Sequence, residues 1–393
     1  MDAPETTFKI EINGKDATND LTPYLLSITY SDNLTGKADE LCIEVDNSDN
    51  RFLNDWFFTP GSIVKAWIGQ MFCGQFMIDE PTESGPPHVA EFKAQSAEFN
   101  GPLRTKKSFN HHKKSLKDIV QKYANDHNLK VVGSIPDLNF TTKIQMRESD
   151  IDFLHNLAVD YGCICSVKGG NLVFDALENV WKTATAKTIY FKDVMSYHFI
   201  TSLPEAVDAS ISASDDAFDE TTHGAIVEDG AFEGVNDISN YTYLNRYRYT
   251  DPVTGKDFAD LDKEQYNIAT HTISITHKKA ESTEEGKRLC YGELLQKKNK
   301  KHKCSLLLPG NELLVAGNSV NVLEFGKRSG YWLIEKSVHK LNKSNSYTTS
   351  IEIIHGAATT GATEPAEEFV SREFNSAGGD GSGGSPLFFE KNL

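Results

Sequence analysis

The sequence predicts a mainly β protein with an α/β insert and two copies of one β unit. The duplication is indicated by residues 61–80 and 317–336, which align with each other without a gap. Four pairs of identical residues carry this alignment: Gly61 with Gly317, Val64 with Val320, Gly74 with Gly330, and Ile78 with Ile334. Similarity at a fixed separation is the sequence signature of repeated structure. Three chains with two such units each would present six units, so a three-fold assembly could meet a six-fold one.

Residues 1–100 are predicted to form the first β domain, because short apolar runs alternate with polar residues at the two-residue period of a strand. Asn13-Gly14, between two such runs, is a strong signal for a hairpin turn. The predicted strands are 8–12, 25–30, 41–45, 63–68, 75–78 and 91–97. Strands near 188–213 are expected to complete this domain.

Residues 101–187 are predicted to be the α/β insert. Two helices are indicated by a serine followed three residues later by an aspartate, the pattern of a capping box, ahead of apolar residues at helical spacing. These pairs are Ser115 with Asp118 and Ser149 with Asp152. Gly162 is suited to end the second helix, and residues 163–174 are predicted to form a hairpin.

Residues 188–356 are predicted to be the second β domain, with a long acidic excursion near 215–262. Residues 357–393 are rich in small and polar residues, which is typical of a flexible linker. The linker ends in an apolar peptide without a core of its own, so we expect this tail to dock on a partner. Its candidate docking residues are Pro386, Leu387, Phe388 and Phe389.

The net charge of −16 argues against a general nucleic-acid binder, and the basic run 297–303 is expected to be the solvated end of a helix. We expect neither a secretory signal nor a membrane segment, because no run has the required pattern or length. Six cysteines are scattered along the chain, several of them in strand patterns. They are predicted to be reduced core thiols of a protein made in a cytoplasm.

Residues that could bind a metal are better explained by structure. Cys163 and Cys165 lie on one face of a predicted strand, but they lack a second pair at matching spacing, so buried thiols are expected. His111-His112 is expected in a basic surface turn. Residues 46–50 lack the glycine and the distal glutamate of a calcium loop, so a plain turn is expected. We therefore predict no catalytic, cofactor-binding or metal site.

Several stretches carry a family resemblance, in this order along residues 5–355: 20–30, 39–47, 74–81, 101–106, 145–154 with Leu157, Ala158, Tyr161 and Gly162, then 308–310, 314–317 and 346–352. Together they resemble the late control D family of contractile phage tails, which is also similar to the N-terminal hub part of VgrG proteins. Each stretch alone is weakly specific, and the ordered set is more specific. The acidic region 215–262 and the tail after residue 355 lie outside the resemblance.

The resemblance implies a structural, non-enzymatic baseplate hub. It implies that three copies form a ring, in which two tube-like β-barrel domains per chain give pseudo-six-fold symmetry. The ring would join a hexameric tail tube, or a tube-initiator protein, to a trimeric central spike and would contact other baseplate proteins. DNA or cargo would pass through the bore without specific binding. The protein would be made in the bacterial cytoplasm and assembled into a phage virion or a contractile injection particle, and the sequence leaves open which particle it is.

Two other hypotheses stay open at this point. A tail-associated peptidoglycan hydrolase would need a pair of carboxylates, and no pair stands out among the many acidic residues. A glycan-binding or receptor-binding baseplate module would use the aromatic run 241–249 as its docking surface. We expect that run to be an alternating strand of a packed domain instead.

Overall fold

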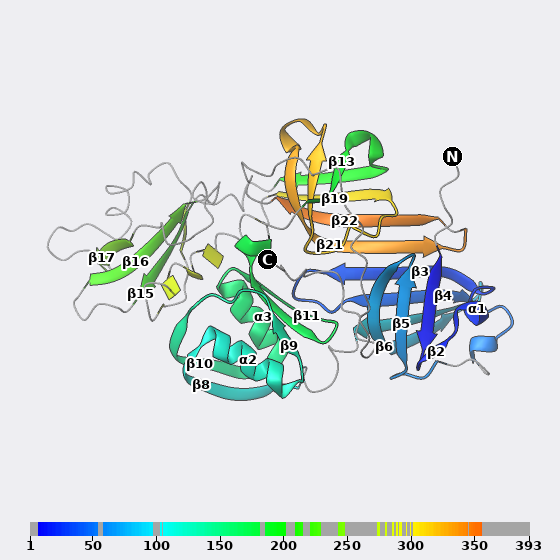
Figure 1. Ribbon diagram of the computed structural model, residues 1–393, viewed down its shortest axis with the longest axis horizontal. Coiled ribbons are helices and arrows are strands. Elements are labelled where there is room, and N and C mark those ends of the chain that lie inside the picture. The colour runs from blue at the N-terminus through cyan, green and yellow to red at the C-terminus, as the bar shows by residue number, and fades with distance from the viewer. Residues whose placement is uncertain are drawn as a thin grey trace, which may run out of the picture.

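The computed structural model describes residues 7–53, 58–96, 103, 105–180, 185–201, 209–214, 221–228, 243–247, 273–275, 302–344 and 346–355, with a few further positions between 280 and 299. The described residues are mainly β, as the sequence predicts, and most of their strands belong to one large sheet. Figure 1 shows the first β module (blue) beside the second (orange), with the insert (cyan to green) next to them.

The first module is an antiparallel set of strands in the order β3-β4-β7-β6-β5-β1-β2. Its elements are β1 (Phe8–Ile12), β2 (Lys15–Asp16), α1 (Thr18–Leu21), β3 (Leu25–Asn33), β4 (Glu40–Asp46), the 3-10 turn Arg51–Leu53, β5 (Ile63–Ile68), β6 (Met71–Ser84) and β7 (Val89–Ser96). Every strand predicted from residues 8 to 97 is present. The main difference is β6, which starts earlier and ends later than predicted.

Alternation along the strands builds the core of the first module. In β5 the side chains of Val64, Ala66 and Ile68 are buried and the residues between them are only partly covered. Burial of such side chains contributes about 1.5–3 kcal/mol for each large aliphatic residue. Asn13 and Gly14 have φ of 50° and 79°, which suits the predicted tight hairpin between β1 and β2.

The second module has the order β14-β19-β22-β21-β20-β13. Its elements are β13 (Thr185–Tyr190), the 3-10 turn Phe191–Asp193, β14 (Ser196–Thr201), β19 (His302–Pro309), β20 (Ser319–Leu323), the 3-10 turn Gly326–Arg328, β21 (Gly330–Asn342) and β22 (Tyr347–His355). The strands near 188–213, expected to complete the first domain, do not pair with it. β13 and β14 pair instead with β20 and β19 of the second module.

The two modules share one strand order and one register. In the first module β5 pairs with β6 so that Val64 lies opposite Phe76. In the second module β20 pairs with β21 so that Val320 lies opposite Trp332, which is the pairing that the sequence alignment requires. The topologies differ at the last strand, since β1 runs antiparallel to β5 and β13 runs parallel to β20.

The turns around this hairpin also repeat. The backbone N–H of Gly61 donates to the carbonyl of Ile78 at 2.8 Å, and that of Gly317 donates to the carbonyl of Ile334 at 2.9 Å. The two glycines have φ of 92° and 91°, a conformation that favours glycine. A register irregularity follows Ile78 in β6 and Ile334 in β21. The duplication indicated by the sequence is therefore confirmed by the backbone.

The insert packs two helices against two small sheets, β10-β8 and β11-β12-β9. Its elements are β8 (Lys107–Ser115), α2 (Leu116–Asp126), β9 (Lys130–Val132), β10 (Asn139–Glu148), α3 (Asp150–Asp160), β11 (Cys163–Lys168), β12 (Asn171–Ala176) and α4 (Leu177–Val180). The capping box of α2 is confirmed: Ser115 Oγ accepts from the N–H of Asp118 at 3.0 Å, and Asp118 Oδ2 accepts from the N–H of Ser115 at 3.2 Å. At α3 the Ser149 side chain accepts from the N–H of Asp152 at 3.2 Å, but the reciprocal bond of a capping box is not formed there.

A separate sheet with the order β17-β16-β15-β18 lies apart from these units (Figure 1). Its strands are β15 (Ala209–Ser214), β16 (Thr221–Glu228), β17 (Tyr243–Tyr247) and β18 (Ile273–Ile275). The predicted acidic excursion thus contains strands, and the aromatic run 241–249 contributes β17. In the part of the chain that the structure describes, no helix is long and apolar enough to cross a membrane.

Candidate functional site: the junction of the two β modules

The two modules join edge to edge through β3 and β21, which pair antiparallel. Ser27–Asn33 lies opposite Lys336–Asn342, so the sheet continues from one module into the other. At the middle of the junction Tyr30 lies opposite His339, and their buried rings stack with centroids 6.0 Å apart. This junction is therefore an extended main-chain interface that is already formed within one chain.

Three buried charged residues lie where the two modules and the insert meet. Lys168 at the end of β11 contacts Asp32 Oδ1 through its ammonium group, which also lies 3.3 Å from Asp39 Oδ2. The second oxygen of Asp32 accepts from the backbone N–H of Ala316 at 2.8 Å, and Asp39 Oδ1 accepts from the N–H of Asn33 at 2.9 Å. These contacts tie the insert to both modules.

The charges of this cluster are unequal, because one cation faces two carboxylates. Burial raises the pKa of Asp39 to about 7; the ammonium of Lys168 opposes this rise and the carboxylate of Asp32 adds to it. Burial disfavours the charged form of Lys168, but the two carboxylates outweigh burial and raise its pKa. Near neutral pH the cluster therefore exchanges a proton at Asp39 while Lys168 stays charged.

A chain of neutral polar groups crosses β21 and β22 beside this cluster. His339 Nε2 lies 3.0 Å from Ser337 Oγ, and its Nδ1 lies 2.7 Å from the hydroxyl of Tyr347. Ser337 donates onward to the carbonyl of Leu314 at 2.5 Å. Burial lowers the pKa of His339 to about 4, so its imidazole is neutral at physiological pH. The arrangement positions the loop before β20 and has no access to solvent at the fully buried His339.

A cavity of about 540 Å³ lies beside the junction, between the β3–β4 connection, α3 and β21. Its lining includes Asp152, His155 and Cys165, residue types that a nucleophilic enzyme could use. Burial raises the pKa of the Cys165 thiol to about 12 and lowers the pKa of His155, so thiol and imidazole are both uncharged at neutral pH. Thr35 donates to the Cys165 carbonyl at 3.0 Å. These features are those of a polar contact between domains rather than of an activated nucleophile.

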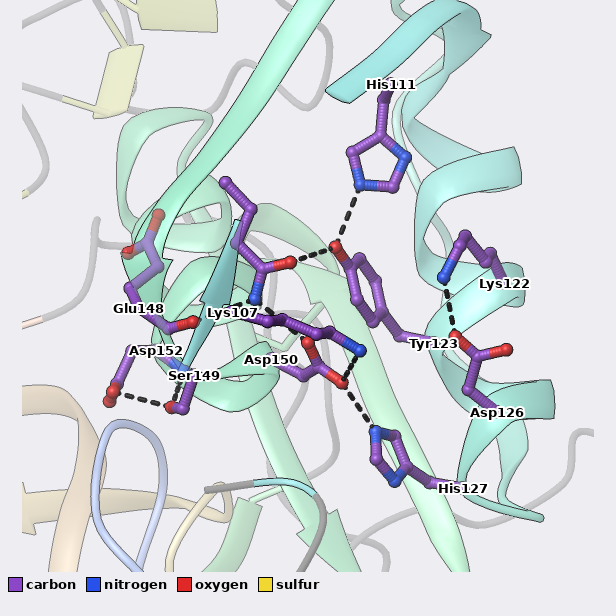
Figure 2. Close-up of polar contacts among 11 residues, drawn as sticks. Lys107, His111, Lys122, Tyr123, Asp126, His127, Glu148, Ser149, Asp150 and Asp152 are labelled. Atoms are coloured by element: carbon purple, nitrogen blue, oxygen red, sulfur yellow. Dashed lines mark hydrogen bonds and ion pairs between the residues drawn. The ribbon is translucent and has the colours of Figure 1, made fainter. Parts of the chain in front are cut away.

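A second polar cluster lies inside the insert (Figure 2). Asp150, the first residue of α3, is fully buried, and its Oδ2 lies 2.7 Å from both Lys107 Nζ and His127 Nε2. Its Oδ1 accepts from the amide of Gln145 at 2.9 Å. Burial alone would raise the pKa of Asp150, but the hydrogen bonds from Lys107, Gln145 and His127 outweigh it and lower that pKa. The ionised carboxylate, at the start of α3, thus connects this helix to β8, to β10 and to the C-terminal end of α2.

His111 belongs to the same cluster and corrects one prediction. The hydroxyl of Tyr123 donates to Gln145 Oε1 at 2.7 Å and lies 2.8 Å from His111 Nε2 (Figure 2). The pair His111-His112 was expected in a surface turn, yet both residues lie inside β8, where neighbouring side chains face opposite sides. His111 is therefore buried and His112 exposed. Burial lowers the pKa of His111, which favours the neutral ring.

The other residues that the sequence singled out have mostly structural surroundings. Cys163 and Cys165 are buried, as predicted. At the calcium-like segment Asp46 Oδ1 accepts from the N–H of Ser48 at 2.9 Å, which is a local turn contact. Across the described ranges, no group of three or more His, Cys, Asp or Glu could hold a metal ion. The docking candidates Pro386, Leu387, Phe388 and Phe389 lie outside the described residues.

The cluster of Asp32, Asp39 and Lys168 was not found from the sequence. Asp32 and Lys168 are far apart along the chain and belong to different domains, so no local spacing connects them. One signal was available. Lys168 is the last residue of a strand of buried residues and precedes Gly169-Gly170, and a buried lysine at such a position needs an anionic partner.

Comparisons with known proteins agree with this architecture. A 174-residue match is 30% identical to the "probable baseplate hub protein" of Escherichia phage 186, and a match of the same length and identity links the chain to the protein of that name in Escherichia phage P2. The resemblance to baseplate hub proteins is confirmed. Each match covers 42% of this chain and 44% of the relative, so the chain spans less than half the length of the curated relatives it matches. No family model matches the chain.

Two solved structures of tail proteins share the fold of this chain. The 43 kDa tail protein of prophage MuSo2 from Shewanella oneidensis superposes with a TM-score of 0.60 at 13% identity, covering 89% of this chain and 98% of that protein. The tail protein from Neisseria meningitidis MC58 gives a TM-score of 0.60 at 10% identity, covering 90% and 98%. At these identities the likeness concerns the fold alone.

Proposed function

We propose that this chain is a structural, non-enzymatic baseplate hub that acts as a homotrimeric adaptor. In this proposal three copies form a ring of tube-like β domains, which joins a hexameric tail tube, or a tube-initiator protein, to a trimeric central spike. The observation that carries the proposal is a repeat within a single sheet. Two modules have the same strand order, and five of the strands in each module also share one register.

The repeat supports the proposal through symmetry. Soluble homo-oligomers are mostly closed and symmetric, so three identical chains would be related by a three-fold axis. Two like modules per chain would then present six similar surfaces to a six-fold tube. The inserts occur once per chain and would present three surfaces, which suits a three-fold spike.

The proposal also covers partners and location. Like the proteins named as hubs, the chain would be assembled into a phage virion or a contractile injection particle, where it would contact other baseplate proteins. Its net charge of −16 would repel DNA or acidic cargo in the bore and so disfavour specific binding there. The apolar peptide Pro386-Leu387-Phe388-Phe389 would be a tethered contact for one of these neighbours.

Native mass spectrometry of the purified chain tests the proposal directly. We expect three copies per particle, and a complex with six tube subunits when the tube protein encoded with it is added. A monomer at all concentrations, with and without the tube and spike proteins, would refute the adaptor. A zymogram on peptidoglycan tests the hydrolase hypothesis, and a clear lysis band from the purified chain would refute the non-enzymatic part of the proposal.

A further inference from the structure

β3 and β14 are the same strand of the repeated module. A row of paired residues crosses each module, and the two rows correspond: Tyr30, Leu41, Ala94 and Ile78 in the first, and Phe199, Cys304, Ile353 and Ile334 in the second. Ile78 and Ile334 are already matched by the sequence repeat. It follows that Tyr30 of β3 corresponds to Phe199 of β14.

These two equivalent strands have unequal surroundings. β3 pairs with β4 on one side and with β21 on the other, and most of its side chains are buried. β14 pairs with β19 on one side, and no other strand of the described chain pairs with its outer edge. On β14 the side chains of Tyr197 and Ile200 are 52% and 49% exposed.

The exposed apolar surface extends beyond β14 itself. Phe191 and Met195, which precede the strand, are 48% and 61% exposed, and Tyr190 is 38% exposed. A group of large apolar side chains on the surface of a soluble protein commonly marks an interaction site. Here the group adjoins an edge whose main-chain groups have no strand partner within the described chain, so the edge and the apolar side chains would be covered together.

The complementary edge is the distal half of β6. In the second module β21 continues past the end of β20, and this overhang, Lys336–Asn342, pairs with β3. In the first module β6 likewise continues past β5, and residues 80–84 pair with β7. Within the described residues the other side of that overhang pairs with no strand.

The junction inside the chain supplies the register for these two edges. It places His339 opposite Tyr30 and Lys340 opposite Thr29. Through the repeat, His339 corresponds to Glu83 and Lys340 to Ser84, whereas Tyr30 and Thr29 correspond to Phe199 and His198. The β14 edge would therefore meet the β6 overhang with Phe199 opposite Glu83 and with His198 opposite Ser84.

We propose that the outer edge of β14 pairs antiparallel with residues 80–84 of β6 from a second copy of this chain, in this register. The inference rests on the proposed trimeric ring and specifies how neighbouring copies join in it. A second copy is the occupant that the structure supports, because the β3–β21 junction is the same pairing made within one chain. Each module would add four strands to one closed sheet: β3, β4, β7 and β6 from the first, and β14, β19, β22 and β21 from the second.

Cysteine cross-linking tests the register. His198→Cys combined with Ser84→Cys places thiols at two exposed positions that are expected to be opposite each other in neighbouring copies. Opposite residues of an antiparallel pair lie within reach of a disulfide. The control combines His198→Cys with Glu80→Cys. Glu80 is exposed on β6 like Ser84, but it lies four residues away from the position expected opposite His198. After mild oxidation we expect a covalent trimer from the matched pair, reversed by reductant, and only background linkage from the control.

The outcomes separate this inference from the proposed function. A trimer by native mass without matched linkage, or with equal linkage in both variants, overturns the register and leaves the adaptor standing. If another protein covers the β14 edge, the result is again a trimer without matched linkage, and the proposed pairing with a second copy is overturned. A monomer under all conditions overturns both.

A charged substitution tests the edge independently. Ile200→Lys places an ammonium in the proposed interface, whereas Ile144→Lys makes the same change on β10 of the insert, where the isoleucine is 53% exposed. We expect the first variant to remain monomeric at concentrations at which the second is trimeric, with the same circular dichroism spectrum for both. Equal trimer fractions for the two variants would overturn the proposed interface.

Discussion

Replacement of Lys168 by methionine removes the cation from the cluster between the modules and the insert. The lysine side chain is 4% exposed, and its two partners are also buried, so neither carboxylate can regain full solvation in the folded variant. Removing one partner of a buried ion pair costs roughly 3–5 kcal/mol. Asp32 and Asp39 keep their backbone N–H donors, those of Ala316 and Asn33 respectively. We therefore expect the unfolding free energy at pH 8 to fall by no more than this range.

The unfolding free energy lost in Lys168→Met is expected to depend on pH, and the titration of Asp39 decides whether the loss grows or shrinks as the pH rises. Its pKa is raised from the ordinary value of 3.8 to about 7, so between these values the folded protein binds a proton that the unfolded chain releases. This group therefore contributes stability at low pH that is lost as the pH rises through about 4 to 7. Without Lys168, which lowers the pKa of Asp39, the Asp39 carboxylate favours protonation still more strongly. The cost of Lys168→Met should consequently be smaller at pH 5 than at pH 8.

Urea unfolding at one fixed protein concentration measures this loss of stability. It is followed by tryptophan fluorescence, to which Trp67 of the first module and Trp332 of the second both contribute. The matched control is the triple variant Asp32→Asn, Asp39→Asn, Lys168→Met, which has the same shape and no charge. We expect the control to recover most of the lost stability, because no buried charge lacks a partner in it. A loss below about 1 kcal/mol at pH 8 would show that the cluster does not stabilise the junction. An equal loss at pH 5 and pH 8 would show that Asp39 does not take up the proton.

Three further predictions concern local features. Ser115→Ala removes the cap of α2 and should cost about 1 kcal/mol, seen as faster amide exchange in that helix; unchanged exchange would contradict it. Tyr123→Phe leaves two buried polar partners without the hydroxyl and should lower the unfolding free energy by about 1–3 kcal/mol, whereas an unchanged value would mean that water replaces it. Gly61→Ala and Gly317→Ala, made separately, should each cost about 1–2 kcal/mol in thermal unfolding, because both positions share one positive φ; a cost at one position alone would argue against equivalent turns.

The features that could be predicted from the sequence depend on local rules. Gly61 and Gly317 mark a backbone conformation that few other residues adopt, and the alternation along β5 reports which face is buried. The caps at Ser115 and Ser149 are likewise short-range patterns with one dominant geometry. Strand, turn and helix positions therefore followed from residues close together in the chain.

The features that were missed depend on partners far apart in the chain. His111 lies in a segment without apolar alternation. Its strand is stabilised by pairing with β10, and its ring lies within hydrogen-bond distance of the Tyr123 hydroxyl. The assignment of β14 to the second module is decided by β19, which follows it by about a hundred residues. The charge on Lys168 is satisfied by another domain. No local spacing contains this information.

The continuity of the sheet between β3 and β21 has a consequence for assembly. A ring of three such chains would contain two kinds of junction between modules, in alternation. The junctions within a chain persist at any dilution because the two modules are covalently connected, whereas the junctions between chains form only when separate chains associate. Dilution would then release whole two-module pieces and never single modules. A mutation at a junction between chains would change the concentration at which rings form, whereas a mutation at the junction within a chain would change whether the chain folds.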